Sequence, residues 1–368
     1  MSTPTSTQDD YTTVAAQLGY AESKRFRAVL ESLMTPDQAR MAAALPGTAA
    51  DVAEKTGVDE GHAKEALDAL FFKGVVFPKG DFNNREYYRF ARSVGQLHDA
   101  SQGSQELDIH EDRELYALWH DFVMNEWYPD VGKANHANMS AKPFQRVVPS
   151  PLALEGLSDV LPCEDYREMI KAQETVVLVP CSCRVRTASV GEPCEHTDEV
   201  ASWKCLQFGR SAEYVLARGS GKRLSQDEAM AVVDECAEDG LLHMWFNTDV
   251  ITGVNMSCNC CRDCCMTYVP MDIVGGDIGK SWAKSRYEAF IDQDKCDGCQ
   301  DCVERCQFDA IDMVKPEATA SKKRSKKLKA LIEPEKCWGC GACVPGCEEA
   351  KAIGFKVVRP PEHIPSPV

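Results

Sequence analysis

The chain has 368 residues, of which 44% are hydrophobic, 27% charged and 8% aromatic. This composition is typical of a globular protein of two or three domains and excludes a fibrous or wholly disordered chain. The formal net charge of −16 disfavours nucleic acid and favours cationic protein surfaces as partners.

Residues 1–16 are polar, rich in Ser and Thr, and predict a flexible tail. They lack the basic and apolar regions of a signal peptide, and no apolar stretch of the chain reaches about 18 residues. We therefore expect a cytoplasmic protein that does not insert into a membrane.

Residues 17–95 predict three helices followed by a hairpin, the order of a winged-helix-like domain. The sequence TPDQ at 35–38 is a capping box with proline at the first helical position, and Thr48 starts a second helix in a similar way. A third helix is expected from Asp59 to Lys73, and two short strands follow it around a Gly/Asn turn.

The third of these helices is acidic. Its charged residues are Asp59, Glu60, Glu65 and Asp68 against Lys64 and Lys73, which gives a net charge of −2. Helices that read a DNA groove are basic, so we favour a module for protein contact or oligomerisation. DNA binding stays as an alternative.

Residues 96–145 predict a helical segment that bridges two domains. Trp119, Phe122 and Trp127 are spaced along it, and an aromatic stripe of this kind is more often core than the lining of a cofactor pocket.

Residues 146–285 predict an α+β domain. The β-branched run from Thr175 to Val179 indicates a buried strand, and the capping box at Ser225 opens a helix that reaches Glu238. The domain is rich in cysteine, and we place most of these cysteines in irregular segments between the regular elements.

The chain has 19 cysteines, bunched as C-x-x-C runs and adjacent pairs, which suits thiolate ligands of metals better than disulfides. Adjacent cysteines point in different directions and rarely serve one metal. For the central domain we predict one further iron–sulfur cluster, with structural zinc and redox-active thiols as alternatives. The candidate ligands are Cys181, Cys183, Cys194, Cys205, Cys258, Cys260, Cys261, Cys264 and Cys265.

Residues 286–358 hold an internal repeat, followed by a short tail at 359–368. The pattern C-x2-C-x2-C-x3-C occurs twice, and each cysteine recurs after 41 residues. Zinc sites commonly use two C-x2-C pairs, so a duplicated triplet with a remote fourth cysteine favours cubane clusters. The eight cysteines are Cys296, Cys299, Cys302, Cys306, Cys337, Cys340, Cys343 and Cys347.

This region resembles the bacterial ferredoxins that carry two 4Fe-4S clusters. In that family the fourth ligand of each cluster comes from the other repeat. The resemblance therefore implies one cluster at Cys296, Cys299, Cys302 and Cys347, and a second at Cys337, Cys340, Cys343 and Cys306. The chain departs from the family in two ways. Gln307 and Glu348 replace the proline after each fourth cysteine, and a basic insertion around 322–329 separates the repeats.

With its PC-x-CR motif at 180–184 and its CNCC segment at 258–261, the whole chain resembles multi-domain ferredoxin-like proteins of anaerobic bacteria. This wider resemblance implies further metal in the central domain and names no reaction. Our first hypothesis is an electron-transfer component of an oxidoreductase system, with single electrons passing through two 4Fe-4S clusters and a third central cluster to a redox partner enzyme. Two alternatives remain: a reductase whose central site acts on a disulfide or other small substrate, and a redox-sensing DNA-binding regulator.

Overall fold

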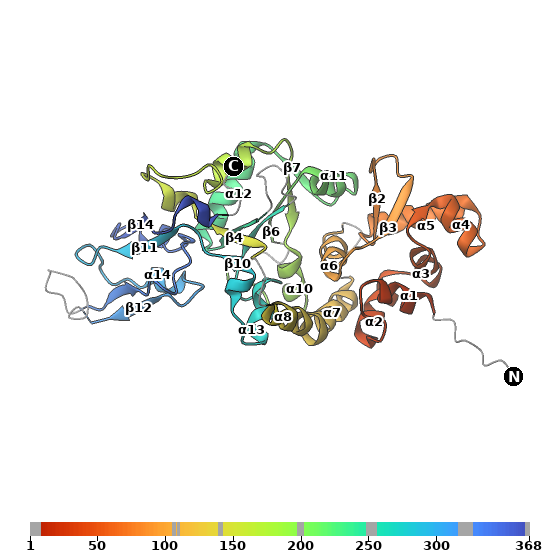
Figure 1. The fold of residues 1–368 in the computed structure, drawn as a ribbon, viewed down its shortest axis with the longest axis horizontal. Coiled ribbons are helices and arrows are strands. Elements are labelled where there is room, and N and C mark those ends of the chain that lie inside the picture. The colour runs from red at the N-terminus through yellow and green to blue at the C-terminus, as the bar shows by residue number, and fades with distance from the viewer. Residues whose placement is uncertain are drawn as a thin grey trace.

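The computed structural model has a mixed α+β architecture, as predicted, with several separate sheets. Its N-terminal helices, a central sheet and the C-terminal strands follow one another along the longest axis (Figure 1). Within the described part of the chain, no helix combines the length and apolar character needed to cross a bilayer. The structure describes residues 9–104, 108, 111–138, 143–196, 202–247, 256–315 and 327–364.

The N-terminal region joins a group of short helices to a three-stranded sheet of order β1-β3-β2. The capping boxes at Thr35 and Thr48 are both formed, and Asp59 caps the acidic helix α5. Residues 17–95 contain four helices instead of the expected three, because α2 precedes the three predicted helices, and the short strand β1 lies between α3 and α4. The elements of the N-terminal region are α1 (Asp10–Gln17), α2 (Lys24–Leu33), α3 (Pro36–Ala43), β1 (Gly47–Thr48), α4 (Ala49–Thr56), α5 (Glu60–Phe72), β2 (Val76–Lys79) and β3 (Tyr87–Phe90).

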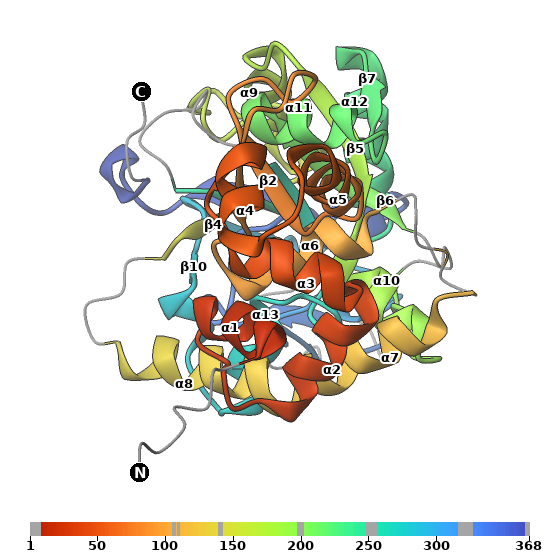
Figure 2. The ribbon, with the colours of Figure 1, turned by 90° about the vertical axis from the view of Figure 1, so that its right-hand side faces the viewer.

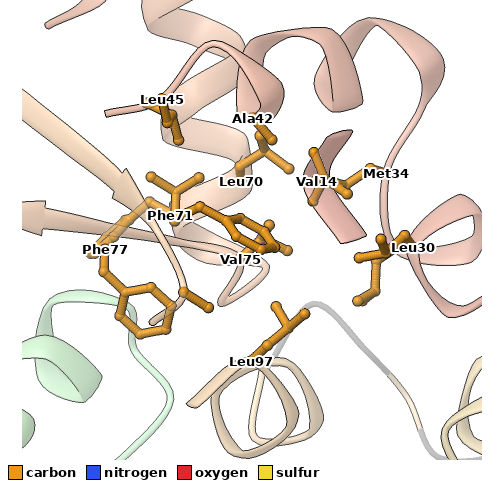
Figure 3. Packing of buried hydrophobic residues seen from close by; sticks show 14 of the residues in the cluster. Val14, Leu30, Met34, Ala42, Leu45, Leu70, Phe71, Val75, Phe77 and Leu97 are labelled. Atoms are coloured by element: carbon orange, nitrogen blue, oxygen red, sulfur yellow. The ribbon is translucent and has the colours of Figure 1, made fainter. Parts of the chain in front are cut away.

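The expected tail at 1–16 is corrected for the residues from Asp10 onward, because they form α1. Asp9 accepts a hydrogen bond from the backbone of Thr12 and so caps this helix. Val14 is fully buried and lies in the same core as Leu30 (Figure 3). The expected tail at residues 1–8 lies outside the described residues.

The predicted helical bridge consists of α6 (Val94–Gln102), α7 (Arg113–Phe122), a π-helical turn (Val123–Trp127) and α8 (Tyr128–Ala137). Helix α7 packs against α2 on one side and against a helix of the central region on the other. Figure 2 shows α7 and α8 running beside the N-terminal helices. Trp119 and Phe122 are fully buried, and Trp127 is nearly so, which confirms the prediction that this stripe belongs to the core.

The central region is built on a seven-stranded sheet of order β10-β4-β8-β9-β6-β5-β7. All neighbouring pairs are antiparallel except β10 and β4. The strands are β4 (Gln145–Val148), β5 (Val176–Pro180), β6 (Trp203–Phe208), β7 (Lys222–Leu224), β8 (Leu242–Phe246), β9 (Met256–Cys260) and β10 (Trp282–Ala283). The helices are α9 (Tyr166–Lys171), α10 (Ser182–Ser189), α11 (Gly209–Ala217), α12 (Gln226–Glu238) and α13 (Tyr268–Ile273).

The two faces of this sheet are covered by different parts of the chain. Along β5, Val176 and Leu178 pack with residues of α9 and α12, whereas Val177 and Val179 belong to the core shared with the N-terminal region. Successive side chains of a strand point to opposite faces, so a run of β-branched residues can fill both. The predicted strand and the capped helix from Ser225 are therefore both confirmed.

The C-terminal region contains two small antiparallel sheets, and each joins one strand from either repeat. Strand β11 (Tyr287–Ile291) pairs with β14 (Ile353–Val357), and β12 (Ile311–Val314) pairs with β13 (Lys329–Ile332). Because the repeat offset is 41 residues, β13 is the counterpart of β11, and β14 that of β12. The short helix α14 (Asp301–Glu304) contains Cys302, the last cysteine of the first triplet.

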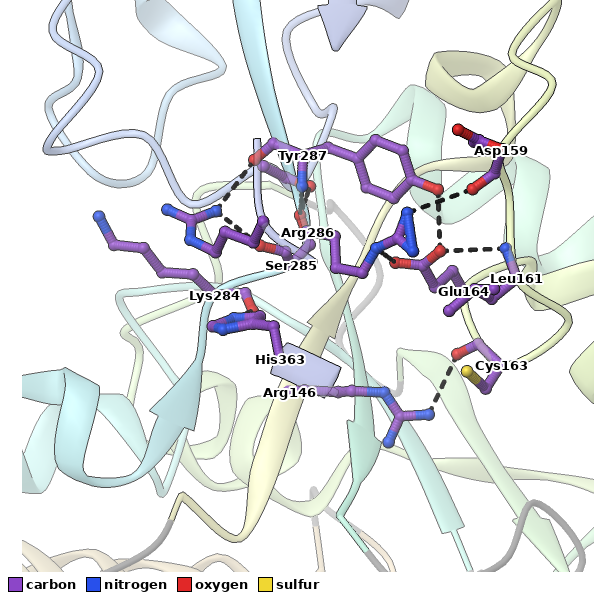
Figure 4. A network of polar contacts seen from close by, with 12 residues as sticks. Arg146, Asp159, Leu161, Cys163, Glu164, Lys284, Ser285, Arg286, Tyr287 and His363 are labelled. Atoms are coloured by element: carbon purple, nitrogen blue, oxygen red, sulfur yellow. Dashed lines mark hydrogen bonds and ion pairs between the residues drawn. The ribbon is translucent and has the colours of Figure 1, made fainter. Parts of the chain in front are cut away.

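A buried polar network joins the central and C-terminal regions (Figure 4). Glu164 and Arg286 form an ion pair of 3.2 Å, with both side chains at most 3% exposed. Tyr287 donates a hydrogen bond from its hydroxyl to Glu164 (2.9 Å). The expected tail at 359–368 is corrected here for residues up to 364, because Arg359 donates to the carbonyl of Ser285, and His363 contacts that of Lys284.

Candidate metal centres

One set of four repeat cysteines surrounds a small cavity in the C-terminal region. Cys296, Cys299, Cys302 and Cys347 all line it, so the last cysteine of the second repeat joins the triplet of the first. Burial raises the pKa of the Cys302 thiol to about 12, and negative charge on the other three adds to this effect. A thiolate at this position needs a bound cation to balance its charge.

The other four repeat cysteines form a second set of the same composition. Burial raises the pKa of Cys340 to about 12, with further contributions from charge on Cys306 and Cys337. The pKa of Cys343 is raised for the same reasons. Cys306 of the first repeat therefore lies with Cys337, Cys340 and Cys343 of the second, which mirrors the arrangement around the first cavity.

The cysteine that crosses between repeats accepts a backbone hydrogen bond in both sets. Ala310 donates its N–H to Cys306 Sγ, and Ala352 donates to Cys347 Sγ, each at 3.3 Å. Such bonds stabilise negative charge on sulfur and are among the features that set the potential of iron–sulfur clusters. The donor set and its buried surroundings fit two cubane clusters.

Left-handed backbone occurs at equivalent positions of the two triplets. Gly341 has a φ of 75°, and its counterpart Gln300 has a φ of 84°. A side chain costs about 1 kcal/mol or more in this conformation, whereas glycine adopts it freely.

We expect Gln300→Gly to raise the free energy of unfolding by about 1 kcal/mol, because it relieves this strain. Thermal unfolding of the anaerobic holoprotein measures the change. Gln300→Ala removes the side chain but keeps the strained conformation, so it serves as the matched control. An equal gain from both variants would show that the backbone is not the cause.

The second set lies beside the central region. Gln307, which follows Cys306, accepts a hydrogen bond from the backbone N–H of Arg262 (2.7 Å) and donates to the carbonyl of Gly240. The ring of Phe308 stacks on Trp338 with a centroid distance of 4.9 Å. Gln307 occupies the position of the family's proline, and its two side-chain bonds give a structural reason for the replacement.

The nine central cysteines, some of which are expected to bind one further cluster, fall into two groups of contacts. Cys260 contacts Cys265 at 3.6 Å, whereas the adjacent Cys261 contacts Cys194 at 3.4 Å. The prediction that neighbouring cysteines point in different directions is confirmed. Their placement in irregular segments is wrong for four of them, because Cys183 lies on α10, Cys205 on β6, and Cys258 and Cys260 on β9.

One group, the Cys194 centre, consists of Cys194, Cys261, Cys264 and Asp263. Their ligand atoms all lie within 4.8 Å of one another, and the three cysteines are buried. Cys194 comes from the loop after α10, and the other three residues follow β9. Three sulfurs and a carboxylate at this spacing suit a single tetrahedral ion such as Zn²⁺. Asp263 was not a predicted ligand, and only its place between two cysteine pairs pointed to it.

Arg184 is the cation of the Cys194 centre. Its Nε donates to Cys194 Sγ (3.3 Å), and its Nη2 donates to the carbonyl of Asn259 (2.9 Å). Contacts with Cys261 and Cys264, followed by the charge of Arg184, lower the pKa of Cys194. Burial opposes the charged form of Arg184, but the surrounding thiolates outweigh it and raise its pKa.

We expect Arg184→Met to weaken zinc binding at the Cys194 centre by about 10- to 100-fold, the usual cost of losing a partner of a metal ligand. Competition with a chromophoric chelator measures the affinity. Arg223→Met, on the exposed strand β7, is the control and is expected to bind normally. Equal affinities in the two variants would contradict a role for Arg184.

Cys163 and Cys236 are buried free thiols outside these metal-site groups. Cys236 lies on α12 and packs in one buried cluster with Cys194, Cys261 and Cys264. His196 follows Cys194 closely but does not belong to the Cys194 centre. Of the basic insertion, only 327–329 is described, and there Lys329 is buried on β13 and donates to the carbonyl of Gln293.

A family model for the 4Fe-4S dicluster domain matches residues 295–353, which contain all eight repeat cysteines. This part of the chain is therefore a 4Fe-4S dicluster domain, and such a domain implies iron–sulfur electron transfer. No curated protein and no solved structure shows significant similarity to the chain.

Proposed function

We propose that the chain is an iron–sulfur electron-transfer protein or subunit that serves a redox partner enzyme. It carries single electrons through two 4Fe-4S clusters to a metal-containing central domain. The observation that carries the proposal is the pairing of each cysteine triplet with the fourth cysteine of the other repeat, in two sets with matching backbone donors.

In this proposal each cluster has three ligands from one repeat and one from the other. Bound clusters supply reversible one-electron chemistry at potentials tuned by hydrogen bonds, charge and solvent exposure. One set is held by Cys296, Cys299, Cys302 and Cys347. The other is held by Cys337, Cys340, Cys343 and Cys306.

The two sets have different surroundings, which supports a direction of transfer. Cys299 is exposed, so the first set is the one that a partner protein reaches. The second set borders the central region through Gln307 and Arg262, and Arg262 lies next to Cys261 of the Cys194 centre. Electrons accepted at the first set would then leave through the second set towards the central cysteines.

The test is anaerobic counting of iron, acid-labile sulfide and zinc. We expect at least about eight irons and a similar number of sulfides per chain, because each cubane contains four of each. Paramagnetic resonance of the reduced protein should show two interacting clusters. Freshly prepared protein that is colourless and free of iron would overturn the proposal.

A second candidate function is reduction of a small substrate at the central domain. A cavity of about 1260 Å³ lies beside the central cysteines and favours this candidate, because a simple carrier needs no space for a ligand. Substrate-dependent changes in the resonance spectrum of the reduced protein would support it. Their absence with disulfide substrates would argue against a disulfide reductase.

A further inference from the structure

Eight cysteines line the large cavity of the central region. Two of them, Cys261 and Cys264, belong to the Cys194 centre, and the other six form a row. The cavity has a volume of about 1260 Å³ and also borders the hairpin β2–β3 and helix α6. It is larger than most ligand pockets, which measure about 300 to 1,000 Å³. The six-thiol row consists of Cys181, Cys183, Cys205, Cys258, Cys260 and Cys265.

The strand geometry explains why these sulfurs lie on one wall. Cys205 pairs in register with Val179, whose side chain faces the N-terminal region. Cys258 and Cys260 are two residues apart on β9, so they share a face of the sheet. Cys181 follows β5 directly and occupies the N-cap position of α10, where its side chain makes no capping hydrogen bond.

Each member of the row contacts the next. Cys181 contacts Cys183 and Cys205, and Cys205 in turn contacts Cys258. Cys260 links Cys258 to Cys265 and lies 3.6 Å from the latter. The backbone also donates to the row, because Met266 donates its N–H to Cys183 Sγ and Thr267 donates to Cys265 Sγ, each at 3.4 Å.

The number of thiols favours a polynuclear centre. A tetrahedral zinc ion takes four ligands, so six contacting thiols exceed what one such ion binds. Thiolates with backbone N–H donors are the usual surroundings of iron–sulfur clusters. The Cys194 centre, by contrast, has the compact spacing of a single ion.

Beside the six-thiol row, one nitrogen of a buried arginine has no hydrogen-bond partner among the described residues. Arg184 is 1% exposed and lines the cavity, and its Nη1 has no hydrogen-bond partner among the described residues. Its Nη2 donates to the carbonyl of Asn259, between Cys258 and Cys260. An unpaired buried donor is costly unless a bound group satisfies it, and a thiolate-bound cluster carries the required negative charge.

The rest of the cavity is positively charged, although the whole chain has a net charge of −16. Among the described residues that line it, Asp99 is the one acidic residue, whereas six are basic. Aromatic side chains, among them Phe77, Trp127 and Tyr214, supply apolar surface. The basic residues are Lys79, Arg89, Arg92, Arg184, Arg210 and Arg218.

We propose that the six-thiol row binds a polynuclear iron–sulfur centre that is separate from the Cys194 centre, and that the cavity binds an anionic aromatic molecule against it. The central domain then has two metal centres instead of one. These two sites extend the function beyond electron transfer through the dicluster domain, because the cavity then binds a defined class of ligand.

Metal counting on three variants of the full chain tests the separate centre. We expect wild-type protein to hold clearly more than about eight irons. Cys205→Ser/Cys258→Ser should lower iron to about eight and keep the metal of the Cys194 centre. Cys194→Ser/Cys264→Ser should lose that metal and keep the additional iron, and Cys163→Ser should lose nothing.

Retention of at least about eight irons in every variant shows that the dicluster domain is folded, so failure of this proposal is distinguishable from failure of the proposed function. If both double variants lose the same metal, the central cysteines form a single centre and the proposal is wrong. It is also wrong if wild-type protein holds only about eight irons.

Two probes of similar shape test the ligand class. Naphthalene-2-sulfonate is anionic, and naphthalene-2-methanol is neutral. We expect only the anion to shift the resonance spectrum of the reduced central centre, and Arg89→Gln/Arg92→Gln should weaken its binding at least tenfold. Equal spectral shifts with both probes, or no shift with either probe, would overturn the assigned ligand class.

Discussion

Cys347→Ala is expected to remove about four irons from the protein, and these irons should come from the cluster of the first repeat. Cys347 lies in the second repeat, but its side chain lines the cavity of Cys296, Cys299 and Cys302. Loss of the fourth thiolate leaves one iron corner without its protein ligand. Anaerobic counts of iron and sulfide measure the loss.

Combined substitutions identify which cluster has been lost. Adding Cys299→Ala to Cys347→Ala should remove no further iron, because both residues serve the same cluster. Adding Cys340→Ala should remove about four more. If adding Cys299→Ala removes about four more irons and adding Cys340→Ala removes none, each repeat binds its own cluster with four sequential cysteines. The proposed exchange of ligands between repeats would then be wrong.

Glu164→Gln should lower the free energy of unfolding by about 3 to 5 kcal/mol. Glu164 and Arg286 are both nearly inaccessible, so the substitution leaves a buried guanidinium without its counter-charge. The variant keeps the shape of the side chain, so packing changes little. Thermal unfolding under anaerobic conditions, followed by circular dichroism, measures the effect.

Glu168→Gln is the control for this experiment. Glu168 pairs with Lys171 at 2.7 Å, but both side chains are about half exposed, and such pairs contribute at most about 1 kcal/mol. A Glu164→Gln variant that unfolds at the same temperature as this control would show that the buried pair does not hold the central and C-terminal regions together.

Features determined by neighbouring residues were predictable from the sequence. The capping boxes at Thr35, Thr48 and Ser225 depend on side chains three residues apart, and all three are formed. The cysteine repeat is also local, and its family match follows from spacing alone. Helix α1 was missed because it is short and polar apart from Val14 and its neighbours, so its burial depends on tertiary contacts.

The division of the central cysteines was not predictable, because it depends on strand pairing. Cys194 meets Cys261 across 67 residues of sequence, and no periodicity relates them. The alternation Cys258-Asn259-Cys260 fits a strand, whereas the adjacent cysteine pairs at 260–261 and 264–265 predict a loop, and the structure follows the alternation as far as Cys260. Arg184 is the last residue of the PC-x-CR motif, yet its contact with Cys194 is visible only in the folded chain.

The pairing of β11 with β14, and of β12 with β13, leaves neither repeat able to complete its own sheet. A peptide containing one repeat alone would expose an unpaired strand edge and a triplet of thiols that lacks its fourth member. In a pair of such peptides, each copy could supply the other with the missing strand and the missing fourth thiol. The fused arrangement makes this mutual completion intramolecular, so the assembly no longer depends on protein concentration.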